Sequence, residues 1–118
     1  MIDETELLED LRHIRRRPKM WMRRGTFNDT CALIHGMDLG TDGQLLAGFR
    51  DWLGKRLGTP HEELPWWDLS LMLTFPEERF SSPVAPIPDD EKARTEPINQ
   101  IEAFLMNREN TNETRIFN

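Results

Sequence analysis

Cys31 and His35 are the pair of residues whose types and spacing could best support nucleophilic catalysis. They lie four positions apart, so a helix would place them one turn apart on the same face. A catalytic cysteine needs an activating base and a cationic setting. Cys31 instead stands in an apolar stretch, so we interpret its thiol as inert and expect both side chains to face the core. Because it is the only cysteine, no intrachain disulfide can form, which fits a reducing compartment.

The sequence contains no other pattern that points to catalysis or to a cofactor. It lacks a glycine-rich phosphate loop and any metal-binding spacing of cysteine and histidine. The three histidines, at positions 13, 35 and 61, are scattered, and we interpret each as structural or surface-exposed. We therefore predict a protein that is not an enzyme, with no catalytic residues, no bound metal and no cofactor.

Charge is distributed unevenly along the chain, whose formal net charge is −6. Residues 1–11 carry five acids and no base, residues 12–24 carry seven bases and no acid, and residues 25–118 carry 16 acids and 8 bases. A mainly acidic protein with one basic strip is a poor general nucleic-acid binder. It better suits a cationic partner, or a partner that presents both signs of charge.

The first candidate surface consists of a pair of tryptophans together with several pairs of acidic residues that lie next to prolines. Trp66 and Trp67 cannot both face one core, because neighbouring residues on a helix point about 100° apart. We expect one of them to be partly exposed, and exposed tryptophan is enriched at binding hot spots. The alternative is solvated loop charge, with the second tryptophan covering a loop. The predicted partner-binding residues are Glu62, Glu63, Trp66, Trp67, Glu77, Glu78, Asp89 and Asp90.

The basic strip from Arg12 to Arg24 forms the second candidate surface. Trp21 interleaves with its cations, and this combination could follow a phosphate backbone. The alternative is that the strip complements the acidic remainder of the chain and the end of the first helix. The candidate nucleic-acid residues are Arg15, Arg16, Arg17, Lys19, Arg23 and Arg24.

The first predicted helix covers residues 4–16, with Asp3 as its N-cap. Pro18 prevents its continuation, because a proline disfavours helical geometry in the residue before it. Residues 17–25 are therefore expected to form a turn or a short extended segment. The anchors of this segment to the core are expected among Met20, Trp21 and Met22.

The second predicted helix covers residues 27–39, with Thr26 as its N-cap and with Phe27, Cys31 and Ile34 on its buried side. Gly36 lies inside it and costs roughly 1 kcal/mol relative to alanine. We expect the close approach of another helix to explain this glycine.

The next two elements are predicted over residues 44–57 and from Pro65 onward. Gly58 is suited to end the first of them in a left-handed conformation. Proline favours the first position of a helix, which fits Pro65. Residues 69–75 are compatible with either a helix or a buried strand.

The last predicted helix lies within residues 89–108, with a possible interruption at Pro97 and a proline-rich loop over residues 81–90 before it. The sequence thus predicts an all-α, single-domain bundle of four to five helices over residues 1–108, followed by a polar tail over residues 109–118. An acidic N-terminus without an apolar signal region predicts a cytoplasmic protein. No window approaches 18 apolar residues, so we predict no membrane partner. The predicted core contains Leu11, Ile34, Phe49, Trp52, Leu53 and Leu69.

Three short motifs carry a resemblance to a known group of proteins. They are Arg17-Pro-Lys-Met-Trp21, Leu33-Ile-His-Gly36 and Phe49-Arg-Asp-Trp-Leu53. Together with an N-terminal helix and a later Trp-rich helix, this pattern resembles small bacterial immunity proteins of polymorphic toxin systems. The resemblance implies a protein that binds and neutralises a cognate toxin domain, which we expect to be basic. The alternative is a small nucleic-acid-associated or regulatory protein that acts through the basic strip.

Overall fold

The computed structural model describes residues 4–58, 64–76 and 87–117, with side chains described up to residue 108. All regular secondary structure within these ranges is helical, which confirms the predicted all-α fold. The elements are α1 (Glu4–Arg16), α2 (Pro18–Trp21), α3 (Phe27–Gly40), α4 (Phe49–Leu57), α5 (Trp66–Thr74) and α6 (Asp90–Phe117). The element beyond the four to five expected is α2, a single helical turn.

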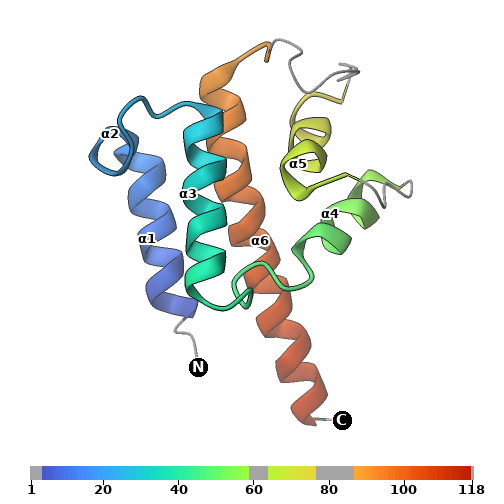
Figure 1. Cartoon of the computed structure of the whole chain (residues 1–118). Coiled ribbons are helices and arrows are strands. Elements are labelled where there is room, and N and C mark those ends of the chain that lie inside the picture. Colours follow the sequence, from blue (N-terminus) through green and yellow to red (C-terminus); the bar gives the residue numbers. More distant parts are fainter. Residues whose placement is uncertain (1–3, 59–63, 77–86, 118) are drawn as a thin grey trace.

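Helix α6 organises the bundle. It packs against α1 and α3 on one side and against α4 and α5 on the other (Figure 1). Its buried side chains meet those of the other helices in one hydrophobic core, whose fully buried members include Leu11, Ile14, Ile34, Leu45, Phe49, Leu53, Leu69, Ile98 and Ile101. None of the described helices has the length and apolar character that a membrane span requires.

Trp52 is the one predicted core residue that the structure places differently. Its ring is partly buried at the margin of the core, stacked on Phe49 with centroids 6.1 Å apart and set edge-on to Phe104 at 5.8 Å. The guanidinium of Arg56 lies 4.1 Å from the ring centroid and covers its outer side. Trp52 therefore covers the edge of the core and does not lie inside it.

Several local signals in the sequence predicted the helix ends correctly. The Thr26 side chain accepts a hydrogen bond from the backbone N–H of Asp29 at 3.1 Å, so it caps α3 as expected. Gly58 ends α4 at φ +77°. Residues 69–74 are helical rather than extended, and α5 begins at Trp66 with Pro65 as its N-cap, one residue later than expected. Asp3 lies outside the described residues.

The helix predicted from residue 44 begins only at Phe49. Side chains from the end of α3 bind the preceding backbone, because Asp38 accepts from the Leu46 N–H at 2.9 Å and Thr41 accepts from the Leu45 N–H at 3.0 Å. Gly48 then adopts φ +87°, a left-handed conformation that glycine tolerates best. Leu45 is nevertheless fully buried. It is apolar because it packs into the core from a turn, and it is not part of a helix.

Two further expectations about helix interiors are wrong. Gly36 is exposed, and a Cβ atom placed there would have no described neighbour within 4 Å, so none of the described helices approaches it closely. Pro97 is buried inside α6 without ending it, because the helix runs on to Phe117. The backbone is thus helical beyond Glu109, where the sequence indicated a tail. Of the proline-rich loop predicted over residues 81–90, residues 87–90 are described, and Asp90 already belongs to α6.

Candidate partner-binding surfaces

The corner between α1 and α3 is built around proline. Arg17 leaves helical geometry at φ −135°, as expected for a residue that precedes proline. Pro18 then starts α2, and the Met22 N–H donates to the Pro18 carbonyl oxygen at 2.9 Å. The segment predicted as a turn or extended piece therefore contains one helical turn, because Pro18 has the backbone φ that a first helical residue needs.

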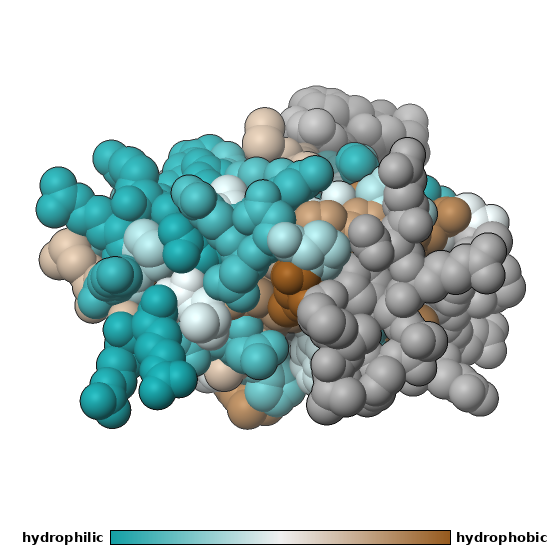
Figure 2. Space-filling view, turned by 90° about the horizontal axis from the view of Figure 1, so that it is seen from above, coloured by the Kyte–Doolittle hydropathy of each residue, from teal (hydrophilic) through white to brown (hydrophobic). Residues whose placement is uncertain are grey.

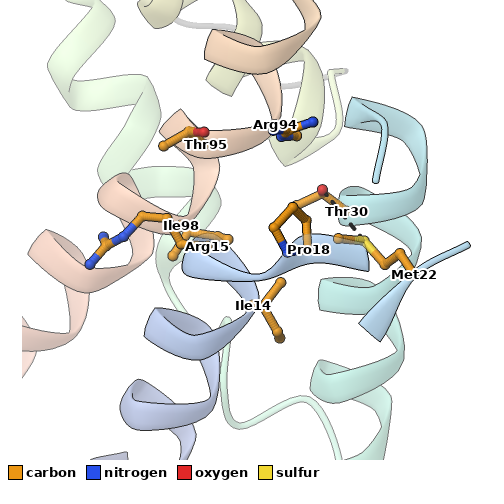
Figure 3. A pocket seen from close by; sticks show the side chains of 8 residues that line it. All are labelled: Ile14, Arg15, Pro18, Met22, Thr30, Arg94, Thr95 and Ile98. Carbon is orange, nitrogen blue, oxygen red and sulfur yellow. Dashed lines mark hydrogen bonds between the residues drawn. The ribbon is translucent and has the colours of Figure 1, made fainter. Parts of the chain in front are cut away.

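Side chains from four segments fix this corner to the body of the protein (Figure 3). Met22 is buried, and the Thr30 hydroxyl lies 3.6 Å from its sulfur. Arg94 of α6 donates to the Gly25 carbonyl oxygen at 3.1 Å. A Cβ atom at Gly25 would lie 3.3 Å from Pro18 Cβ, so the two segments are tightly packed. The space enclosed below the corner leaves no room for a water molecule.

Met20 and Trp21 project from this corner instead of anchoring it. Their side chains are 67% and 41% exposed, and the Trp21 ring stands edge-on to His13 with centroids 5.6 Å apart. Of the three residues among which the anchors are expected, only Met22 is buried in the core. Exposed cations flank them on both sides in the sequence. We call this surface the basic corner; it comprises Arg16, Arg17, Lys19, Met20, Trp21, Arg23 and Arg24.

The remaining arginines of the strip are bound within the fold. Arg15 donates to Glu102 at 2.5 Å and to Asn99 at 2.6 Å, and Arg12 donates to Glu102 at 3.1 Å. Burial raises the pKa of the Glu102 carboxyl, but the two arginines outweigh it and hold that pKa below its ordinary value. Arg15 thus joins α1 to α6. In the part of the chain that the structure describes, the five cations of the basic corner form no ion pair.

The tryptophan pair divides between core and surface, as the sequence predicted. Trp66 is 8% exposed and packs on Phe49 with centroids 5.9 Å apart, so the structure removes it from the candidate partner-binding residues. Its indole N–H has no hydrogen-bond acceptor among the described residues. Trp67 is only partly buried and stands edge-on to His35 at 6.2 Å.

Trp67 forms one wall of an open groove of about 250 Å³ between α3 and α5. We call it the α3–α5 groove; it is lined by Phe27, Asn28, Cys31, Ala32, His35 and Trp67. His35 is exposed at this groove, so the expectation that it faces the core is wrong. The sequence carried a signal for the groove, because Phe27, Cys31 and His35 recur every four residues, but we interpreted that face as wholly internal.

The chemistry of Cys31 agrees with an inert thiol. Burial, assisted by the charge of Asp68, raises the pKa of Cys31 to about 12. Burial also raises the pKa of the Asp68 carboxyl on α5. At neutral pH the thiol therefore stays protonated, and a thiol is a far weaker nucleophile than a thiolate. Among the described side chains, no group of three or more potential metal ligands comes together.

Of the acidic candidate residues, the structure describes Asp89 and Asp90, and both carboxylates accept hydrogen bonds from backbone N–H groups. Asp90 accepts a hydrogen bond from the Phe27 N–H at 3.1 Å, and Asp89 accepts from the Lys92 N–H at 3.2 Å. Both carboxylates thus satisfy donors at helix N-termini while remaining exposed. Glu62, Glu63, Glu77 and Glu78 lie outside the described residues.

No protein-family model, curated protein or solved structure matches the chain.

Proposed function

We propose that the protein is a non-catalytic binding protein that neutralises a cognate toxin domain by protein–protein interaction. The observation that supports this proposal is the α3–α5 groove. It is open, mainly apolar and walled by the partly exposed ring of Trp67. Buried aromatic anchors in pockets of this kind carry most of the free energy in protein interfaces. The groove is large enough to accept one long side chain of a partner.

The electrostatics of the groove favour a basic side chain of the toxin domain. Burial is the main cause of the raised pKa of the groove residue Cys31, and the negative charge of Asp68 adds to it, which places that carboxylate near the groove. An arginine or lysine could lay its methylene stem along the apolar wall and place its charge beside Trp67 and Asp68. The excess of acid over residues 25–118 would add long-range attraction toward a basic partner.

Blocking the groove without disturbing the core provides a direct test. Ala32 lines the groove and is exposed, so Ala32→Arg adds bulk and positive charge at low structural cost. Ala47 is exposed in the turn before α4 and does not line the groove, so Ala47→Arg is the matched control. The partner to co-express is the C-terminal domain of any large toxin-like protein that a neighbouring gene encodes.

We expect the unmodified chain to rescue growth and to co-purify with that domain in equal amounts. Ala32→Arg should weaken the complex by about 2 kcal/mol or more, chiefly through faster dissociation, whereas Ala47→Arg should bind normally. Circular dichroism should show the same melting temperature for both variants. Lack of a complex with the unmodified chain would contradict the function, and normal binding by Ala32→Arg would contradict the assigned surface.

A further inference from the structure

The basic corner combines two features that folded proteins seldom leave uncovered together. Met20 and Trp21 are adjacent apolar residues on a one-turn helix; Met20 is largely exposed and Trp21 is exposed over two-fifths of its surface. Five cations flank them within nine residues of sequence, and none forms an ion pair with a described residue. The corner lies at the edge of the bundle, where Figure 1 shows α2 turning outward beside α1. An exposed apolar tip with a cationic border indicates a contact surface.

We propose that the basic corner binds the surface of an anionic lipid bilayer. Met20 and Trp21 enter the headgroup region, and the surrounding cations face the lipid phosphates. Tryptophan prefers this interfacial layer, and basic side chains are attracted to anionic leaflets. The corner is separate from the α3–α5 groove, so this proposal does not depend on the binding of a toxin domain.

The shape and composition of the corner favour a bilayer over single-stranded nucleic acid. Proteins that bind single strands use a basic groove in which several aromatic rings stack on successive bases. Here the surface projects outward and offers one ring, Trp21, whose neighbour His13 already stands against it. Met20 is the more exposed of the two apolar side chains, and its flexible thioether provides no ring for stacking but readily packs among lipid chains.

The basic corner is held in a fixed conformation before it contacts lipid. Met22, Gly25 and Arg94 hold it in place, so little conformational entropy is lost on binding. Seen from above, most of the surface on the side of α1 and α2 is hydrophilic (Figure 2). The excess of acid over residues 25–118 disfavours contact of the rest of the chain with an anionic surface, although Asp89, Asp90 and Glu91 are exposed at the start of α6, close to the corner.

Sedimentation with vesicles tests the proposal on the full chain. Vesicles of equal parts phosphatidylglycerol and phosphatidylcholine should bind the protein at low salt, and pure phosphatidylcholine vesicles should not. The double substitution Arg23→Gln with Arg24→Gln should lower the partition coefficient roughly 30-fold, given the attraction per cation near an anionic leaflet. The control Lys55→Gln with Lys92→Gln removes two exposed cations elsewhere and should leave it nearly unchanged.

Fluorescence quenching by brominated lipid tests the insertion of Trp21. The protein has four tryptophans, and only Trp21 lies in the corner, so Trp21→Phe should abolish the quenching while vesicle binding persists. The proposal is overturned if phosphatidylglycerol vesicles do not bind, if both double variants behave alike, or if quenching survives in Trp21→Phe. Salt-sensitive binding to a single-stranded RNA oligonucleotide without vesicle binding would instead assign the corner to nucleic acid.

Discussion

Asp90, the first residue of α6, accepts a hydrogen bond from the backbone N–H of Phe27, the first residue of α3. The two residues are 63 positions apart, and the donor and acceptor atoms are separated by 3.1 Å. The first N–H groups of a helix have no partner within it, and a carboxylate there also meets the positive end of the helix dipole. The start of one helix thus caps the start of another.

Loss of this cap should lower stability. Asp90→Ala is expected to reduce the free energy of unfolding by about 1 kcal/mol, measured by urea denaturation, because it leaves the Phe27 N–H with water alone. Glu91→Ala, at an exposed neighbouring position, is the control and should have little effect. A stable Asp90→Ala variant that no longer binds a partner would show that Asp90 serves recognition instead.

The Glu102 cluster should make stability depend on pH. Because Arg15 and Arg12 hold the pKa of Glu102 below its ordinary value, its contribution is present above the unfolded-state pKa and is lost as pH falls through the folded-state pKa. Glu102→Gln should therefore destabilise the protein by about 1–2 kcal/mol near neutral pH and by progressively less as the pH falls through the folded-state pKa of Glu102. Urea midpoints across this range measure the difference. A constant difference between the two proteins would contradict this role.

Met22 and Trp21 should differ in their effects on folding although they are neighbours. Met22 is buried under the corner, so Met22→Ala is expected to cost about 2 kcal/mol or more. Trp21 is 41% exposed, so Trp21→Ala should cost less than Met22→Ala. Thermal unfolding followed by circular dichroism ranks the two. The reverse order would restore the sequence-based interpretation of Trp21 as a structural anchor.

The raised pKa of Cys31 predicts slow alkylation. Iodoacetamide near pH 8 should label the native protein far more slowly than the urea-unfolded chain, because almost no thiolate is present in the fold. Asp68→Asn should speed the native reaction modestly, since it removes one cause of the raised pKa. Mass spectrometry over time follows the label. Equal rates in native and unfolded protein would restore Cys31 as a candidate nucleophile.

Local signals in the sequence were sufficient to predict most of the helices. The Thr26 cap, the stop at Gly58 and the constraint of Pro18 on Arg17 each act within a few residues, so they can be recognised without tertiary information. The late start of α4 could not be recognised in this way. It depends on Asp38 binding the backbone of Leu46, a contact across a turn whose path the apolar periodicity does not reveal.

The candidate surfaces were predicted less well, because exposure is a property of the assembled bundle. The composition of the strip identified its cations. Only the assembled structure shows that Arg15 is paired with Glu102 of α6, whereas Arg16 remains exposed. Similarly, the helical angle between Trp66 and Trp67 predicted that one would be partly exposed. Which of the two it is depends on where Phe49 lies.

The central position of α6 also sets the order in which this protein can fold during synthesis. The helix that contacts α1, α3, α4 and α5 is the last of the six to leave the ribosome. Until it emerges, the apolar faces that it covers lack this partner, and the Phe27 N–H lacks its Asp90 acceptor, although Thr26 can already cap α3. The nascent chain therefore exposes the apolar faces of its preceding helices, and a chaperone that shields apolar segments would act on it most until α6 has emerged.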